Sequence, residues 1–95
     1  MRFTRQARDD LMRLYDFLLE RDLGAAERAI EAIEQALRLA CASPFTCRIA
    51  DAGHPFLREL VIPFGSSGYV ALLEIAPRRT INVLAVRHQR EEDFF

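Results

Sequence analysis

The sequence contains no lysine, and all 13 of its cationic residues are arginine. Arginine stays protonated at cellular pH, so a mechanism that needs a lysine as base or nucleophile is excluded. The formal net charge of −1 also lacks the basic excess typical of general nucleic-acid binders, although it permits a local basic patch. We therefore expect no direct, sequence-specific DNA binding.

Long apolar runs are absent as well. None approaches the ~20 residues that a membrane-spanning helix requires. Residues 1–5 lead directly into a charged amphipathic stretch, without the apolar core of a signal peptide. These absences predict a cytoplasmic protein that does not bind a membrane.

Residues that bind metals or cofactors are scarce. Cys41 and Cys47 are expected to be reduced thiols in the cytoplasm, and with His54 and His88 they show no CxxC or HxxxH spacing. No serine lies in a GxSxG elbow, and no glycine-rich loop is expected between a strand and a helix. We therefore expect no metal and no cofactor.

The first half of the chain has the pattern of helices. The 95 residues suit a single domain, and apolar residues recur at steps of three and four along two segments, which predicts helices over residues 5–22 and 24–42. Thr4 is a suitable N-cap for the first helix, and Gly24 is the expected break between the two. Such a short connection predicts an antiparallel helical hairpin.

The second half has the pattern of strands. Residues 43–56 contain two prolines and are predicted to form an irregular loop. Tight turns then separate three predicted antiparallel strands over residues 57–64, 69–76 and 79–87. A polar tail is predicted over residues 88–95. The predicted fold class is α+β, with the helical hairpin packed on one face of a three- to four-stranded, mainly antiparallel sheet. Residues 1–4 could add the fourth strand, and the other sheet face should stay open.

Arg58, at the start of the first predicted long strand, is a candidate functional residue. Its guanidinium group could clamp a phosphate or a carboxylate on the sheet. Alternatively, it could form a structural ion pair with Glu59 or Glu74, since most surface ion pairs are weak and structural.

A second candidate is the cationic cluster of Arg87, His88 and Arg90 after the last predicted strand. His88 could act there as a general base or a hydrogen-bond donor. Alternatively, the segment is a polar extension whose charge is largely cancelled by the acidic residues 91–93. The aromatic pair Phe94-Phe95 should either fold back onto the domain or dock a partner.

Several segments along the chain carry a family resemblance. They are Phe3 to Leu11, Ala25 to Ile30, Leu57 to Leu60, Pro63 to Gly65, Gly68 to Val70 and Val83 to Glu91. In this order they cover nearly the whole chain, and they resemble the ParE/RelE superfamily of bacterial type II toxins, most closely its ParE branch. The resemblance is carried by the combination of these segments.

The resemblance implies a toxin that binds and poisons DNA gyrase and is neutralised by a cognate antitoxin, in a possible toxin–antitoxin hetero-oligomer. Arg58, Arg87, His88 and Arg90 are then the expected target-binding residues. We expect the antitoxin to cover an exposed sheet edge and apolar residues off the core stripes of the helices, namely Phe17, Leu19 and Leu39.

Two alternatives stay open. A relative of the RelE branch would be a ribosome-dependent mRNA endonuclease in which Arg58, Arg87 and His88 carry the phosphate and proton chemistry. The missing lysine, the near-neutral charge and the lack of a tyrosine near His88 in the tail favour the ParE branch over this enzyme. The third possibility is an inactive family member that serves only as a partner-binding scaffold.

Overall fold

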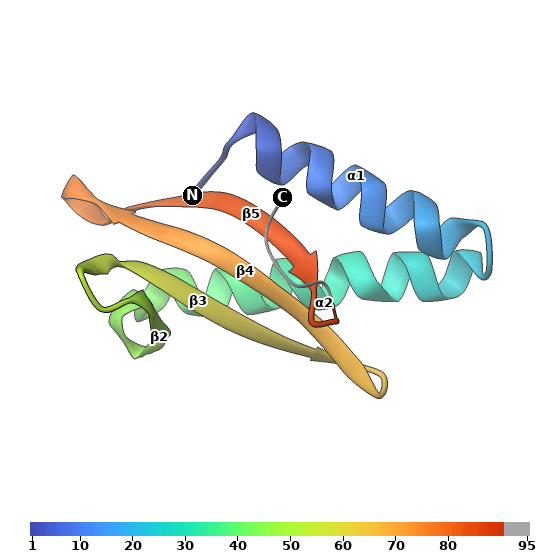
Figure 1. The fold of residues 1–95 in the computed structure, drawn as a ribbon. Coiled ribbons are helices and arrows are strands. Elements are labelled where there is room, and N and C mark those ends of the chain that lie inside the picture. Colours follow the sequence, from blue (N-terminus) through green and yellow to red (C-terminus); the bar gives the residue numbers. More distant parts are fainter. Residues whose placement is uncertain (91–95) are drawn as a thin grey trace.

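The computed structural model describes residues 1–90, which form two helices packed on a five-stranded sheet (Figure 1). The predicted α+β fold, with an N-terminal helical hairpin on one sheet face, is confirmed. Most of the predicted polar tail, including its acidic residues and Phe94-Phe95, lies outside the described residues. None of the helices within residues 1–90 is long and apolar enough to cross a membrane.

The two helices are α1 (Arg5–Leu19) and α2 (Leu23–Ala42). Thr4 caps α1 as predicted, because its hydroxyl accepts a hydrogen bond from the Ala7 N–H at 3.1 Å. The break between the helices was predicted at Gly24, and this was wrong. Asp22 starts α2 instead, since its carboxylate accepts the backbone N–H groups of Gly24 and Ala25.

The sheet contains more strands than the sequence pattern indicates. Its order is β1-β5-β4-β3-β2, with β1 parallel to β5 and all other neighbours antiparallel. The strand bounds are β1 Arg2–Phe3, β2 Arg48–Asp51, β3 His54–Phe64, β4 Ser67–Ala76 and β5 Thr80–His88.

The prediction of an irregular loop over residues 43–56 was wrong in its second half. This segment holds the short 3-10 helix η1 (Pro44–Thr46), the strand β2 and the first residues of β3. Three of the four residues of β2 are exposed, so the strand has none of the apolar alternation that marks a half-buried strand. Its backbone pairing with β3 defines it, and that pairing leaves no pattern in the local sequence.

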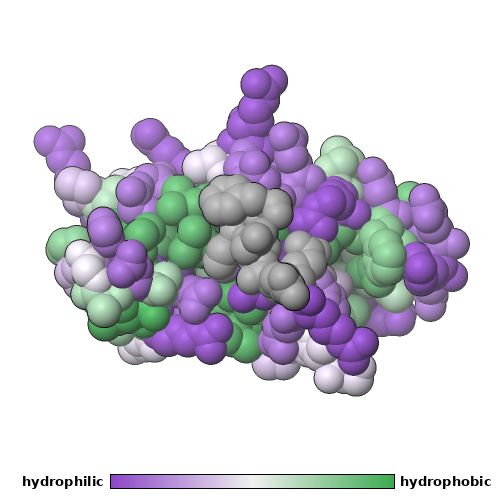
Figure 2. Space-filling model, viewed as in Figure 1, coloured by the Kyte–Doolittle hydropathy of each residue, from purple (hydrophilic) through white to green (hydrophobic). Residues whose placement is uncertain are grey.

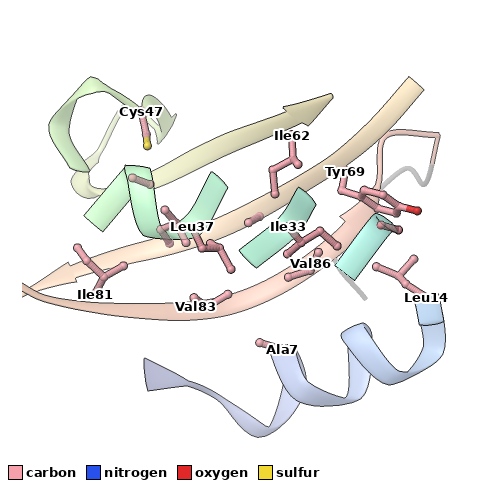
Figure 3. Packing of buried hydrophobic residues seen from close by; sticks show 14 residues of the cluster. Ala7, Leu14, Ile33, Leu37, Cys47, Ile62, Tyr69, Ile81, Val83 and Val86 are labelled. Atoms are coloured by element: carbon pink, nitrogen blue, oxygen red, sulfur yellow. The ribbon is translucent and has the colours of Figure 1, made fainter. Parts of the chain in front are cut away.

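The core lies between the helical hairpin and the sheet (Figure 3). Ile33 and Leu37 of α2 lie at its centre against Ile62, Val83 and Val86 of the sheet, and each of the five is at most 2% exposed. Ala26 and Ala29 are also buried, and their small side chains let the two helices approach closely.

The other sheet face is not uniformly open, contrary to expectation. Val70 and Ala85 lie outside the core cluster, yet only 3% and 2% of their surfaces are exposed. Val61, which pairs with Val70 in the sheet, is 41% exposed. The accessible part of this face therefore lies toward β3.

The β4–β5 turn has an unusual backbone. It consists of the 3-10 turn η2 (Pro77–Arg79), in which Arg78 and Arg79 have φ angles of 61° and 59°. Left-handed backbone costs a residue with a Cβ atom about 1–2 kcal/mol, so glycine or asparagine usually occupies such positions. Two consecutive arginines here make this the most strained turn among the described residues.

Candidate functional site

His88, the last residue of β5, lies in a hydrogen-bonded cluster with residues of the β3–β4 turn. Its Nε2 is 3.0 Å from the Ser67 hydroxyl oxygen, and its Nδ1 accepts a hydrogen bond from the Arg90 N–H at 3.2 Å. The Tyr69 ring meets the imidazole edge to face, with centroids 5.6 Å apart. These contacts place both ring nitrogens in bonds within the protein.

The two hydrogen bonds determine the tautomer of the neutral His88 ring. Because Nδ1 accepts a bond from a backbone N–H, its lone pair must be free of a proton. The proton of the neutral imidazole is therefore on Nε2, which donates it to the Ser67 oxygen. In this state His88 cannot accept the Ser67 proton, so the pair does not form an activated nucleophile.

A groove of about 790 Å³ opens beside this cluster, and we call it the His88 groove. Apolar side chains of α1 (Leu14, Phe17, Leu18) and of the sheet (Phe64, Tyr69) line it, with Arg13, His88 and Arg90 among its polar residues. Burial raises the pKa of the Tyr69 phenol, which keeps this group protonated and uncharged at neutral pH. The groove is thus mainly apolar, with cationic groups around it.

Arg87 and Arg90 are placed differently from each other. Arg87 alternates with His88 along β5 and so points to the opposite sheet face. Its Nη1 donates to the carbonyl oxygens of His88 at 3.2 Å and Gln89 at 3.4 Å, which holds the end of the strand. Arg90 is exposed and lines the groove.

Arg58 performs a structural role far from this cluster. Its Nε donates to the Pro55 carbonyl at 2.8 Å, and its Nη1 donates to those of Cys47 at 2.9 Å and Phe45 at 3.1 Å. The guanidinium carbon also lies 5.0 Å from the centroid of the Phe45 ring. Arg58 therefore holds η1 and the following turn against β3.

The prediction of a structural ion pair between Arg58 and Glu59 or Glu74 was wrong. Glu59 pairs with Arg48 at 3.0 Å across the β2–β3 ladder. Glu74 accepts a hydrogen bond from Asn82 at 2.9 Å. Arg58 lies on the core side of β3, in the alternation of Leu60 and Ile62, and so faces away from both carboxylates.

The structure does not bring the three residues of a nuclease-type site together. Arg58 pairs with Leu73 of β4, whereas His88 pairs with Tyr69, four residues further back along the same strand. Strand rise and strand spacing put the Arg58 and His88 Cα atoms on the order of 16 Å apart. The Arg87 side chain lies on the other sheet face, so it shares no common site with Arg58 or His88.

The apolar residues expected to contact a partner are all exposed. Phe17 is 55%, Leu19 41% and Leu39 76% exposed. Phe17 lines the His88 groove, and Leu39 lines a second groove of about 440 Å³ between α2 and β3, which we call the Leu39 groove. Leu19 lines neither groove.

The Leu39 groove lies beside an open sheet edge. The pairing of β2 with β3 ends at Glu59, so no strand within residues 1–90 covers the outer edge of β3 over residues 60–64. Leu60 and Val61 of this segment line the groove together with Leu39. Pro63 lacks a backbone N–H and shortens the run of donors that this edge offers.

Asp10 is a buried polar residue that sequence reasoning missed. It is 4% exposed and accepts hydrogen bonds from the Val86 backbone N–H at 2.9 Å and from Gln6 at 2.8 Å, while Arg13 lies 3.6 Å away. The only sequence signal is its position, because the helical spacing Ala7, Asp10, Leu14 places it on the core stripe. Near the start of a helix, an aspartate is ordinarily explained by the helix dipole.

The described residues offer no metal site. Among residues 1–90, no group of three or more histidine, cysteine, aspartate or glutamate side chains is placed to hold a metal ion. Cys47 is buried, and desolvation raises the pKa of its thiol, against the opposing effect of the nearby Arg58 charge. A thiol held in this protonated state is a poor metal ligand and a poor nucleophile.

Comparison with models of known protein families gives a match over nearly the whole chain. Residues 1–93 match the sequence model of a family described as the ParE toxin of the type II toxin–antitoxin system, parDE. A search of curated proteins finds no match.

Proposed function

Because the chain belongs to the ParE toxin family and is the toxin component of a type II toxin–antitoxin system, we propose that it binds and poisons DNA gyrase until a cognate antitoxin neutralises it. In this mechanism the toxin acts by binding gyrase and catalyses no reaction itself. The spatial separation of Arg58, Arg87 and His88 supports it most directly, since a nuclease would need their groups around one phosphate.

The hydrogen bonds of these residues support the same proposal. Arg58 donates to three backbone carbonyls, and both His88 nitrogens are engaged within the protein. A general base must reach the proton that it abstracts, and the neutral His88 has its lone pair directed at the Arg90 N–H.

We place the gyrase contact at the end of β5. His88 and Arg90 lie side by side there, Arg87 extends from the opposite sheet face at the same strand end, and Arg90 is exposed. Arginine is enriched among residues that dominate binding energy, because its planar group makes several hydrogen bonds at once. Arg58 lies outside this proposed contact and holds η1 against β3.

The antitoxin is proposed to occupy the two apolar grooves. Phe17 and Leu39 are each more than half exposed, and each lines one of the grooves. The open edge of β3 beside Leu39 adds backbone groups to which an extended segment can bind. The resulting toxin–antitoxin hetero-oligomer would be cytoplasmic.

A supercoiling assay tests the gyrase proposal. Purified toxin is titrated into DNA gyrase with relaxed plasmid and ATP, and the expected result is inhibition with accumulation of cleaved DNA. The variant Arg90→Gln should lower inhibition by about 5- to 30-fold, as for a contact of about 1–2 kcal/mol. Arg38→Gln, an exposed helix arginine outside both grooves, is the matched control.

A folded, growth-arresting toxin with no effect on gyrase would overturn the proposal. The next candidate is then the ribosome-dependent mRNA endonuclease, tested by RNA cleavage on programmed ribosomes. Under that mechanism, His88→Ala abolishes cleavage and toxicity together. A toxin that arrests no growth when produced without antitoxin would instead be an inactive scaffold.

The antitoxin surface is tested by calorimetric titration of the cognate antitoxin. Phe17→Ser and Leu39→Ser should each weaken binding by at least tenfold, since each removes an exposed apolar contact from a groove. Met12→Ser is the control, because Met12 is 62% exposed on α1 but lines neither groove. Unchanged affinity of both groove variants would refute this placement.

A further inference from the structure

The β4–β5 turn holds a pair of arginines in a backbone conformation that arginine disfavours. Arg78 has φ 61° and ψ 34°, and Arg79 has φ 59°. Ala76 pairs with Thr80, so three residues connect the strands, and glycine or asparagine fits the two left-handed positions better than arginine does. A strained backbone conformation persists only where the surrounding structure enforces it, and such conformations are concentrated at functional sites. This turn therefore requires an explanation outside its own stability.

The two guanidinium groups are directed to solvent. Arg78 and Arg79 are both exposed, and within residues 1–90 neither takes part in a side-chain hydrogen bond or an ion pair. Glu74, the acidic residue of β4 nearest the turn in sequence, already accepts a hydrogen bond from Asn82. Figure 2 shows hydrophilic side chains projecting at the end of the molecule where Figure 1 places this turn.

A third arginine lies next to the pair. Arg2 of β1 is exposed and pairs with Asn82 of β5, three residues after Arg79. Strand geometry puts the Arg2 and Arg79 Cα atoms on the order of 10 Å apart. We call Arg2, Arg78 and Arg79 the arginine tip.

The overall charge of −1 conceals a polarised molecule. The β4–β5 turn with Arg78 and Arg79 is at one end of the molecule, whose longest extent is 39 Å, and the connection between α1 and α2 is toward the other (Figure 1). Around that connection, residues 16–28 carry four acidic side chains (Asp16, Glu20, Asp22 and Glu27) and two arginines (Arg21 and Arg28), so this stretch is net negative. A polyanion is therefore attracted to the tip and orients the molecule, although the whole chain has no basic excess.

We propose that the arginine tip contacts the phosphate backbone of duplex DNA, without reading its sequence. This inference rests on the proposed function, since gyrase would present such a duplex to a bound toxin. A duplex carries one charge per ~1.7 Å of its axis, so three arginines whose Cα atoms lie within on the order of 10 Å are spaced to meet several phosphates. Arginine forks bind phosphate oxygens in pairs.

The surroundings of the tip favour a phosphate backbone over an acidic protein surface. Protein-binding hot spots combine arginine with buried aromatic or aliphatic contacts. Among residues 1–90, none of the exposed large apolar side chains belongs to β4, η2 or β5, and the one adjacent to the tip in sequence is Met1, beside Arg2, at 50% exposed. The turn itself therefore offers charge without an apolar anchor.

The test is fluorescence anisotropy with a labelled 20-base-pair duplex of mixed sequence, the full chain, and a titration of NaCl. For three phosphate contacts, the logarithm of the binding constant should fall with the logarithm of salt at a slope of about −2.7. Replacing Arg78 and Arg79 together by glutamine should reduce the slope to about −0.9 and weaken binding at low salt by at least tenfold.

Two further variants separate charge from folding. Arg28→Gln with Arg38→Gln removes two exposed charges from α2, and this control should keep the wild-type slope. Arg78→Asn with Arg79→Gly relieves the strained turn, so it should raise the melting temperature while it weakens DNA binding as the glutamine pair does. This combination cannot result from a folding defect.

Several results of these DNA-binding measurements would overturn the inference. Wild-type protein that does not bind the duplex at low salt, or turn variants that bind like wild type, would disprove it, as would an equal loss in the α2 control. Turn variants that lose gyrase inhibition yet bind DNA normally would assign the tip to an acidic protein surface. The supercoiling assay keeps the two proposals apart: DNA binding without gyrase inhibition overturns only the gyrase proposal, and inhibition without DNA binding overturns only this one.

Discussion

The carboxylate of Asp10 accepts a hydrogen bond from the backbone N–H of Val86 at 2.9 Å, and this bond joins α1 to the outer edge of β5. The same edge carries the two-residue strand β1 at Asn82 and Val83. A buried side chain of a helix thus satisfies a strand group that would otherwise point to an unpaired edge.

The variant Asp10→Ala should therefore lower the free energy of unfolding by about 2–3 kcal/mol, because it leaves the Val86 N–H buried without a partner. Asp10→Asn keeps an oxygen acceptor and should lose less. Urea denaturation measures both, and the exposed neighbour Asp9 provides the control Asp9→Ala. Equal effects at positions 9 and 10 would contradict the role given to Asp10.

Arg58 should stabilise the fold rather than contact the target. Arg58→Lys replaces a fork that reaches three carbonyls by a single ammonium group, and we expect a loss of about 1–2 kcal/mol. Amide exchange around η1 should accelerate, as measured by hydrogen–deuterium exchange. Arg48→Lys affects only the exposed pair with Glu59 and should change stability by less than about 1 kcal/mol. A stable Arg58→Lys protein that fails to inhibit gyrase would instead make Arg58 a target contact.

The neutral His88 ring should carry its proton on Nε2. Long-range ¹H–¹⁵N NMR distinguishes the two tautomers through the shifts of the ring nitrogens. Ser67→Ala should leave the tautomer unchanged, because the Arg90 N–H still donates to Nδ1, and should cost about 0.5–1.5 kcal/mol of stability. A proton found on Nδ1 would reopen the possibility that His88 acts as a base toward Ser67.

Stability should fall at alkaline pH because of Cys47 and Tyr69. Burial raises the pKa of the Cys47 thiol above 9.0 and that of the Tyr69 phenol above 10.0. The unfolded chain releases these protons at lower pH than the folded chain does. The two groups therefore contribute fully to the free energy of unfolding below about pH 9, and this contribution is lost as pH rises through their pKa values in the folded chain. Urea denaturation between pH 7 and 11 measures the loss. Cys47→Ala should remove the part of it that begins near the thiol's unfolded pKa.

Several features could be predicted from local patterns because local chemistry decides them. The helical periodicity from Ala7 to Leu18 and from Ala26 to Cys41 indicates the two helices, and Thr4 caps the first of them. The turns around Gly65 and Arg78 separate the three long strands. Cys41 and Cys47 are free thiols in the described structure.

The candidate site could be predicted only in part. The residues Arg87, His88 and Arg90 are neighbours in sequence, so their proximity follows from the chain itself. Arg58 was grouped with them through the resemblance, and only the sheet register shows that it lies at the other end of β4. Phe17 and Leu39 were found because they fall off the core stripes, but which groove each lines depends on the neighbouring strands.

The sequence by itself determined the fold class, the helical hairpin and the toxin family, because these follow from periodicity, capping and the order of short segments. The tertiary structure alone decided the partners of polar groups: β2 on β3, Asp10 on Val86, and Arg58 on the carbonyls of η1 and its neighbours. Such partners are brought together by pairing across the sheet and packing between layers, which depend on residues distant in the chain and leave no local pattern. The arginine tip results from both, since the sequence supplies Arg78 and Arg79 and the pairing of β1 with β5 brings Arg2 beside them.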